Sequence, residues 1–340
     1  MIVPADYHNM HAWLLACRRP LLIAHRRPDG DALGALAAMA LALRALGGDP
    51  RPTLFEPLPM RYKLLADAVP WHDWTRERQR LTSECDALVI LDTCTYAQLE
   101  AVTDYLPSAP PTLVVDHHPT RDEIGTRPDD LRVLDETAGA VCLLLHEWMQ
   151  SLGLPVSPTI ATALLVGVAT DSGWFRFANA DARMFRAAAD LLAAGAPANA
   201  IYRAIYEQDP PARLRLIGRM LNTLELYADG RLAVMKLRGA DFQAVGADHR
   251  MTEDLVNEAT RLAGLEAVIL FSEEPDGQVR VNLRSKQTLD VAELAARFGG
   301  GGHQRAAGAR PSGCWEEVVT AVTAAAVAAL TNVGGPTAAC

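Results

Sequence analysis

The stretch of sequence that decides the fold is LLIAHRRPDGDALGALAAMALALRAL, residues Leu21–Leu46. It starts with a short apolar run followed by Pro and Gly, which is typical of a buried strand in a parallel sheet. Its second half consists of strong helix formers and ends before Gly47-Gly48, a signal for the end of a helix. His25, Asp29 and Asp31 therefore lie on a turn that leaves a strand and enters a helix, where open α/β sheets bind their ligands.

The three polar side chains on this turn suit a cation. Asp29 and Asp31 are two residues apart, so they point the same way in an extended loop. Two carboxylates and the His25 imidazole that converge on one point repel unless a cation lies between them, and His with Asp suits Mn, Zn or Fe. The alternative is a solvated loop in which Asp31 only caps the helix.

Two further apolar runs end in residues of the same kind. Ala87–Leu91 ends directly at Asp92, and Thr112–Val115 ends at Asp116-His117-His118. Since the carboxyl ends of parallel strands lie at one edge of a sheet, these groups should converge there. The pattern predicts an α/β domain with a parallel sheet, helices on both faces and a metal site at the sheet edge. Adjacent residues cannot easily aim at one point, so we expect one histidine to bind metal and the other to face substrate.

Another carboxylate follows a segment that should be a buried helix. Residues Ile160–Thr170, IATALLVGVAT, are almost wholly apolar, and Asp171 comes next. A carboxylate in this position is costly unless it is paired or bound to a metal. The alternative is a helix-ending residue whose carboxylate remains in water.

The second half of the chain has a different pattern. Strand-like segments at 232–237, 267–271 and 279–283 accompany an amphipathic helix near 252–262 and lack acidic ends, which indicates a smaller α+β domain. A break at Gly195-Ala196-Pro197 closes the first domain. We expect that domain at 1–196, a helical linker at 197–226, the second domain at 227–332 and a tail at 333–340.

A glycine-rich stretch stands out in the second domain. Gly299–Gly302 are four consecutive glycines, followed by His303-Gln304-Arg305, and Arg284 and Lys286 precede them. Such a backbone can approach a ligand closely and turn several N–H groups toward an anion. The alternative is a flexible surface loop. The stretch has no Walker lysine pattern and is therefore not a P-loop for nucleoside triphosphates.

Composition limits the classes of function. The chain has 340 residues, enough for two domains with cores of their own, and a formal net charge of −9. This charge argues against holding long nucleic acid on a basic surface, but permits a short anionic substrate. Six scattered cysteines argue against a disulfide framework or a structural zinc site. No apolar run is suited to cross a bilayer and the start is not a signal peptide, so we expect a cytoplasmic protein.

Taken together, these motifs resemble those of the DHH/DHHA1 phosphoesterase superfamily. The resemblance rests on five stretches in order along nearly the whole chain: AHRRPDGDALG, Asp92, the triplet Asp116-His117-His118, LLVGVATDSGWFRF around Asp171, and the C-terminal GGGGHQRAAGA. The length and the lack of additional domains are similar to the NrnA-type nanoRNase and pAp-phosphatase group. RecJ-type exonucleases are longer, and the membrane-bound cyclic-dinucleotide phosphodiesterases carry transmembrane regions.

The resemblance implies a role for each matching position. The expected ligands of two divalent cations, taken to be Mn2+, are His25, Asp29 and Asp92 for one, and Asp31, Asp92, His117 and Asp171 for the other, with Asp92 bridging. The catalytic pair would be His118, which contacts the scissile phosphate, and Asp116, which orients the histidines. The substrate would be held across a cleft between the domains by Arg284, Gly301, Gly302 and His303. Gln98 stands near a position where relatives often have Arg.

The function implied is hydrolysis of short oligonucleotides or dinucleotides to mononucleotides, and of pAp to AMP, by two-metal activation of water. The expected substrates exclude long duplex nucleic acid, and no membrane partner is expected; a homodimer is left open. The alternatives are a cyclic- or linear-dinucleotide phosphodiesterase, a pAp phosphatase with little nanoRNase activity, and a RecJ-like single-strand exonuclease. A nucleotide-binding sensor that retains the metal site is the alternative outside the enzymes.

Overall fold

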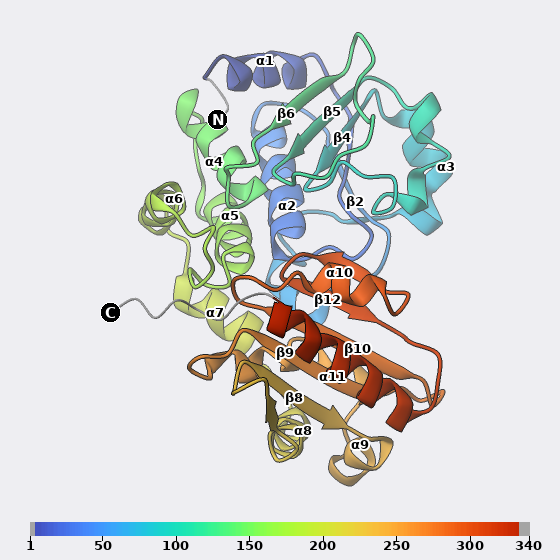
Figure 1. The fold of residues 1–340 in the computed structure, drawn as a ribbon. Helices are drawn as coiled ribbons and strands as arrows, with labels where there is room; N and C mark the ends of the chain where they lie inside the picture. Colours follow the sequence, from blue (N-terminus) through green and yellow to red (C-terminus); the bar gives the residue numbers. More distant parts are fainter. Residues whose placement is uncertain (1–3, 333–340) are drawn as a thin grey trace. The chain divides into compact units, whose positions relative to one another are not determined.

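The computed structural model describes residues 4–332, and the chain divides into two compact units, Met1–Gln208 and Asp209–Cys340. Each unit has its own sheet and its own helices (Figure 1). The division falls inside the predicted linker. The predicted domain boundaries stay predictions, and the predicted tail at 333–340 lies outside the described residues.

The first unit is built on a parallel six-stranded sheet, as predicted. The strand order is β3-β2-β1-β4-β5-β6, and every neighbouring pair is parallel. This order reverses direction between β1 and β4, and ligands of open α/β sheets bind at such a reversal. The strands are β1 (Pro20–Ile23), β2 (Arg51–Leu54), β3 (His72–Asp73), β4 (Ala87–Leu91), β5 (Thr112–Asp116) and β6 (Leu131–Leu134).

Helices cover both faces of this sheet, which confirms the predicted α/β architecture (Figure 1). Alternate strand residues face opposite sides, so Leu22 and Val89 belong to one buried cluster while Leu21 and Leu88 belong to another. The first cluster contains the apolar residues of α1 (Pro4–Leu15), α2 (Gly30–Ala45), α4 (Val141–Ser151), α5 (Pro158–Asp171), α6 (Ala182–Ala193) and α7 (Ala198–Tyr206). The second cluster contains the apolar residues of α3 (Trp74–Glu84).

Helices α2 and α5 approach closely because glycines lie where they meet. A Cβ atom on Gly34 would lie 2.3 Å from the carbonyl oxygen of Ala163, and one on Gly30 would lie 2.2 Å from Thr170 Oγ1. Real side chains do not tolerate such distances. The glycines therefore let the start of α2 lie beside the end of α5, and each of these two helix ends carries one of the predicted ligands.

The second unit has a mixed sheet, which confirms the predicted α+β class. Its strand order is β11-β12-β10-β9-β8-β7, and only the β8–β9 pair is parallel among the described strands. The strands are β7 (Glu225–Tyr227), β8 (Leu232–Leu237), β9 (Ala267–Glu273), β10 (Val279–Ser285), β11 (Gly301–His303) and β12 (Ala306–Ala309). The helices are α8 (Pro211–Leu221), α9 (Gly239–Val245), α10 (Val291–Ala296) and α11 (Trp315–Asn332).

Three features differ from the sequence prediction. The segment between Arg51 and Glu84, for which the sequence pattern predicts no strand or helix, contains β2, β3 and α3. The helix predicted near 252–262 is instead two short 3₁₀ turns, His249–Thr252 and Leu255–Arg261. Asp254 between them has a φ of 63°, which an α-helix cannot contain. The glycine-rich stretch, for which a flexible surface loop is the alternative interpretation, is partly a hairpin formed by β11 and β12.

Within the part of the chain that the structure describes, none of the helices is sufficiently long and apolar to span a membrane.

Candidate metal centre

The structure brings the six predicted metal ligands together at the sheet edge. They come from the ends of β1, β4 and β5, the start of α2 and the end of α5. Their ligand atoms form groups in which all atoms lie within 4.8 Å of one another. Two groups consist of predicted ligands only: His25, Asp29 and Asp92, and Asp31, His117 and Asp171. A third group joins Asp92 and His117 with His118, which is not among the six.

Asp92 belongs to two of these groups and lies between the other ligands. One carboxylate oxygen is 3.6 Å from His25 Nε2 and the other is 3.5 Å from His117 Nε2. Its backbone has a φ of 62°, a left-handed conformation that is uncommon for a residue other than glycine. Such strain tends to persist where the surrounding structure imposes it for function. The conformation turns the chain sharply at the end of β4 and leaves the carboxylate buried at the strand end.

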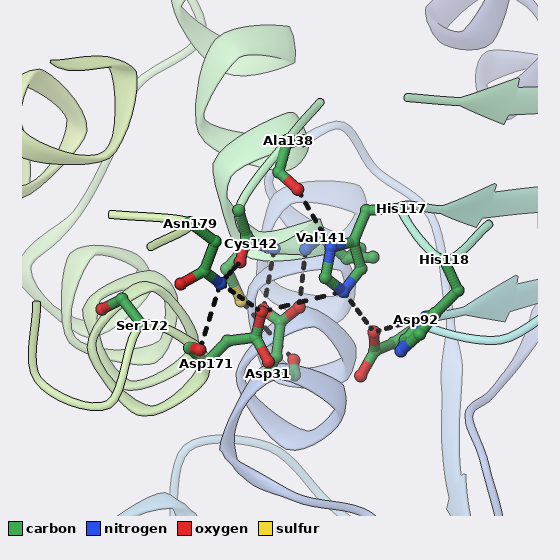
Figure 2. A network of polar contacts seen from close by, with 12 residues as sticks. Asp31, Asp92, His117, His118, Ala138, Val141, Cys142, Asp171, Ser172 and Asn179 are labelled. Carbon is green, nitrogen blue, oxygen red and sulfur yellow. Dashed lines mark hydrogen bonds and ion pairs between the residues drawn. The ribbon is translucent and has the colours of Figure 1, made fainter. Parts of the chain in front are cut away.

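His117 is oriented by the main chain. Its Nδ1 donates to the carbonyl oxygen of Ala138 at 3.0 Å, so Nε2 is the nitrogen left for a ligand bond. Nε2 lies 3.8 Å from an oxygen of Asp171 and 3.5 Å from Asp92 (Figure 2). Neither His117 Nε2 nor Asp92 Oδ1 has a hydrogen-bond partner among the described residues, although both atoms are buried. Buried polar atoms without partners are costly, and a cation bound between them would remove that cost.

Asp31 is held by a different helix from its own. Its two carboxylate oxygens accept the main-chain N–H groups of Val141 at 2.5 Å and Cys142 at 2.9 Å, at the start of α4. These N–H groups have no partner inside their helix, and the helix dipole favours a negative charge there. The alternative, in which Asp31 is a solvated cap of α2, is wrong, because Asp31 is almost fully buried and Asp29 caps α2.

Asp29 and Asp31 join separate groups, contrary to the extended loop that we expected. Helix α2 begins at Gly30, so Asp29 is its N-cap and Asp31 lies in its first turn, and the two carboxylates do not share one side of a strand. Asp29 lies 3.9 Å from His25, and Asp31 belongs to the group with His117.

Asp171 ends its helix abruptly. Gly173, Trp174 and Phe175 have φ values of 56°, 58° and 63°, a left-handed run that cannot continue α5. The alternative, with the carboxylate in open water, is wrong: three quarters of the side chain is covered, and it lies beside His117.

In this arrangement the site holds protons. Burial, followed by the charge of Asp92, raises the pKa of Asp31 to about 7. Burial and the charge of Asp31 raise the pKa of Asp171 well above its ordinary value. Burial lowers the pKa of His117, but Asp92 and the neighbouring carboxylates outweigh it and raise the value to about 10. Protons thus offset part of the negative charge, and a divalent cation would replace them.

His118 and Asp116 form a separate pair at the end of β5. Asp116 is fully buried, and its Oδ1 accepts His118 Nδ1–H at 2.8 Å together with the main-chain N–H groups of His117 and His118. This bond fixes the ring of His118 and directs Nε2 away from Asp116. His118 is 29% exposed, whereas His117 is 12% exposed. The two histidines therefore differ in environment, and the assignment of one to metal and the other to substrate stays a prediction.

Sequence reasoning did not find the groups that support the ligands. Asn179 donates to Asp171 and to Gly139, and the Ala138 carbonyl orients His117. Backbone groups leave no side-chain signal in a sequence, and an isolated Asn in a loop has no distinctive pattern. Gln98 has a structural contact as well, since its Oε1 accepts the hydroxyls of Thr93 and Thr95 beside Asp92.

The predicted substrate-binding residues lie in the second unit. Arg284 in β10 pairs in register with Ala306, which in turn pairs with His303 across the hairpin. A Cβ atom on Gly302 would lie 2.5 Å from the Ala306 carbonyl oxygen, so the hairpin requires glycine there, whereas Gly301 faces open space. Arg284 and the hairpin thus occupy neighbouring strands at one end of this sheet. The predicted cleft between the domains stays a prediction.

The chain is similar to known proteins over most of its length. The N-terminal domain of the DHH family matches residues 20–168, and the DHHA1 domain matches residues 230–332. The bifunctional oligoribonuclease and PAP phosphatase NrnA of Thermus thermophilus is 29% identical over 322 residues, 91% of each chain. The protein of the same description from Bacillus subtilis is 26% identical over 85% of this chain and 88% of its own.

Among solved structures, an exopolyphosphatase-related protein from Bacteroides fragilis has a TM-score of 0.90 and 21% sequence identity, over 98% of both chains. RecJ of Thermus thermophilus, solved in complex with Mn2+, has a TM-score of 0.50 and 16% identity, and the match covers 55% of that chain. At these identities the likeness shows the fold alone.

Proposed function

Because this chain belongs to the DHH/DHHA1 phosphoesterases, a family of hydrolases, we propose that it is a Mn2+-dependent enzyme for short nucleotide substrates. It would hydrolyse short oligonucleotides and dinucleotides to mononucleotides, and pAp to AMP. A single observation carries the proposal: two ligand groups lie side by side. One is His25, Asp29 and Asp92, the other is Asp31, His117 and Asp171, and Asp92 Oδ1 of the first lies 3.5 Å from His117 Nε2 of the second.

The residues present fit two cations. Imidazole and carboxylate groups suit Mn2+, and two buried atoms in the site, Asp92 Oδ1 and His117 Nε2, have no hydrogen-bond partner among the described residues. One cation would be held by His25, Asp29 and Asp92, and the other by Asp31, Asp92, His117 and Asp171. When bound, two divalent cations lower the pKa of a water molecule and offset charge on a phosphate.

The protein's own groups would bind and orient the substrate. His118, held by Asp116, would donate a hydrogen bond from Nε2 to a phosphate oxygen, because its Nδ1 is already occupied. Arg284 would contribute a charged donor to a second phosphate or to the terminal nucleotide. Positioning of this kind lowers the entropic part of a reaction barrier by several kcal/mol.

The substrate class is supported by the relatives and by charge. The two relatives described above are named as acting on oligoribonucleotides and PAP. The net charge of −9 disfavours a long nucleic acid held along a surface. A short substrate needs only a few positive groups near the cations.

The test is hydrolysis of pAp and of a labelled RNA series from dinucleotide to 20-mer, with Mn2+ and with chelator. We expect Mn2+-dependent turnover that is fastest on the shortest oligonucleotides, together with release of phosphate from pAp. A preference for the 20-mer would replace the proposal with a RecJ-like exonuclease. Faster cleavage of cyclic dinucleotides would favour a cyclic-dinucleotide phosphodiesterase. Tight binding without turnover on any substrate would favour a nucleotide sensor.

A further inference from the structure

Asn179 connects two parts of the metal centre. It lies in the loop between α5 and α6, and its amide nitrogen is 3.0 Å from the carbonyl oxygen of Gly139, 3.2 Å from that of Asp171 and 3.4 Å from Asp171 Oδ2 (Figure 2). All three partners are acceptors, so only the nitrogen end of the amide can face them. The amide orientation is therefore fixed by the contacts themselves.

The segment that Asn179 contacts also holds the other two members of the same ligand group. The Ala138 carbonyl accepts His117 Nδ1–H, and the N–H groups of Val141 and Cys142 bind the carboxylate of Asp31. Residues 138–142 thus contact His117 and Asp31, and Asn179 links this segment to Asp171. We name residues 138–142 the cradle segment.

The loop that carries Asn179 packs tightly on the cradle segment. A Cβ atom on Gly139 would lie 2.7 Å from the main-chain oxygen of Asn179 and 3.0 Å from Met184. This packing fixes the main chain of Asn179 on the cradle segment, so its amide can hold Asp171 at a set position relative to that segment. Removal of the amide removes this link and should let Asp171 shift relative to the cradle segment.

We propose that Asn179 is a positioning residue for the cation site formed by Asp31, His117 and Asp171. It touches neither a cation nor the substrate in this role; it sets the geometry of the ligands. The inference rests on the proposed function, because it requires that this group bind a cation. Loss of a residue that orients metal ligands typically weakens metal affinity about 10- to 100-fold.

Two variants remove the contact in different ways. Asn179→Ala deletes the amide. Asn179→Asp keeps the shape of the side chain but replaces the donating nitrogen by a carboxylate oxygen, which would face the carbonyl oxygens of Gly139 and Asp171 and the Asp171 carboxylate. We expect Mn2+ affinity at the second site to fall about 10- to 100-fold in both, while the group of His25, Asp29 and Asp92 still binds one Mn2+. Asn222→Ala, at an exposed position after α8 in the other unit, is the matched control.

The experiment is a Mn2+ titration of the full chain followed by electron paramagnetic resonance. The wild type and Asn222→Ala should bind two Mn2+ per chain and give the signal of a spin-coupled pair. The Asn179 variants should show an isolated Mn2+ signal after the first equivalent, and saturating Mn2+ should restore much of their turnover. Circular dichroism identifies any variant that fails to fold. If one Asn179 variant does not fold, the Mn2+ titration of the other tests the inference.

Two results would overturn the inference, and they can be told apart. A folded Asn179→Ala protein that titrates and couples like the wild type, even with a lower melting temperature, would show that Asn179 only stabilises the loop. A wild-type protein that shows neither a spin-coupled Mn2+ pair nor substrate turnover would refute the proposed function itself, and the inference with it.

Discussion

Asp92 is the residue on which both candidate cation sites depend. Its two oxygens face His25 on one side and His117 on the other, and no other described residue reaches both in this way. Its left-handed backbone also limits how it can be replaced. An alanine in this left-handed conformation at position 92 would cost roughly 1–2 kcal/mol in steric strain, whereas asparagine tolerates the conformation better.

We predict that Asp92→Asn lowers Mn2+-dependent kcat by about 100-fold or more while the fold is retained, because the bridging charge is lost and the backbone is not strained further. Asp92→Ala should also abolish the activity. Steady-state kinetics and metal analysis test this. Asp229→Asn is the control, since Asp229 has a φ of 55° at an exposed turn outside the metal centre. Turnover at the wild-type rate in a folded Asp92→Asn protein would refute the bridging assignment.

At the scale of single residues, sequence patterns were informative where side chains carry the chemistry. His25, Asp31, Asp92 and Asp171 were found because each follows or precedes an apolar run. Their supports were not found: the Ala138 carbonyl and the N–H groups of α4 come from residues with no chemical signature. Any residue has a carbonyl and nearly any has an N–H, so only the backbone path selects which ones serve.

At the scale of elements, one partly buried ionic cluster connects α4, α6 and the segment after β6. The Arg183 guanidinium donates to Asp135 at 3.0 Å and to Glu147 at 2.8 and 2.9 Å, and Tyr7 donates to the same glutamate. Asp135 is fully buried and its main chain leads into the cradle segment. The cluster thus supports the path of the chain toward His117.

We predict that Arg183→Met lowers the free energy of unfolding by about 3 kcal/mol, because it leaves the Asp135 carboxylate buried without its cation. Urea unfolding at pH 7 tests this. Arg186→Met, at an exposed position of the same helix, should change stability by less than about 0.5 kcal/mol. Equal stability of the two variants would contradict the structural role of the cluster.

The same cluster gives a pH dependence with a definite sign. Burial raises the pKa of Asp135, but the bonds from Thr137 and Arg183 outweigh it and hold the value below the ordinary 3.8. A carboxylate with a lowered pKa in the folded state adds stability above its unfolded pKa and loses it as the pH falls through the folded value. Without Arg183 the folded pKa of the buried Asp135 should be higher, so the variant should lose less stability than the wild type as the pH falls. Unfolding curves at about pH 3 to 5 should therefore separate Arg183→Met from the wild type more weakly than curves at pH 7.

Element prediction succeeded for β1, β4 and β5 and for α2 and α5, since these are long or strongly apolar and are flanked by clear boundary residues. It missed β2 and β3, which have four and two residues, and β6, whose residues are only partly buried. Strands this short have too few residues for a pattern, and they form because neighbouring strands offer them hydrogen bonds.

At the scale of the whole molecule, the proposed chemistry needs groups from both units. All six predicted metal ligands lie in the first unit, and Arg284 with the glycine hairpin lies in the second. The second unit would then contribute to substrate binding and not to the cations.

We predict that Arg284→Ala raises KM for pAp and dinucleotides about tenfold or more, the effect of losing one charged hydrogen bond. Hydrolysis of a minimal aryl phosphate ester should remain largely intact, because that substrate needs only the metal centre. Kinetics on both substrates test this. Arg280→Ala, four residues earlier on β10, serves as the control. An equal loss of activity on both substrates would count against a role of Arg284 in binding the nucleotide.

The sequence alone determined the class of both units, the sheet edge that carries the site and the side chains that gather there. Apolar periodicity and residue chemistry are local properties, and they can be read without coordinates. Only the tertiary structure decided how these side chains divide between two groups, which nitrogen of His117 is free and which backbone groups hold Asp31. Those outcomes depend on the start of α2 at Gly30, the close packing of α2 on α5 and the approach of the α4 N-terminus, because distances between segments far apart in the chain are set by packing and leave no pattern in the sequence.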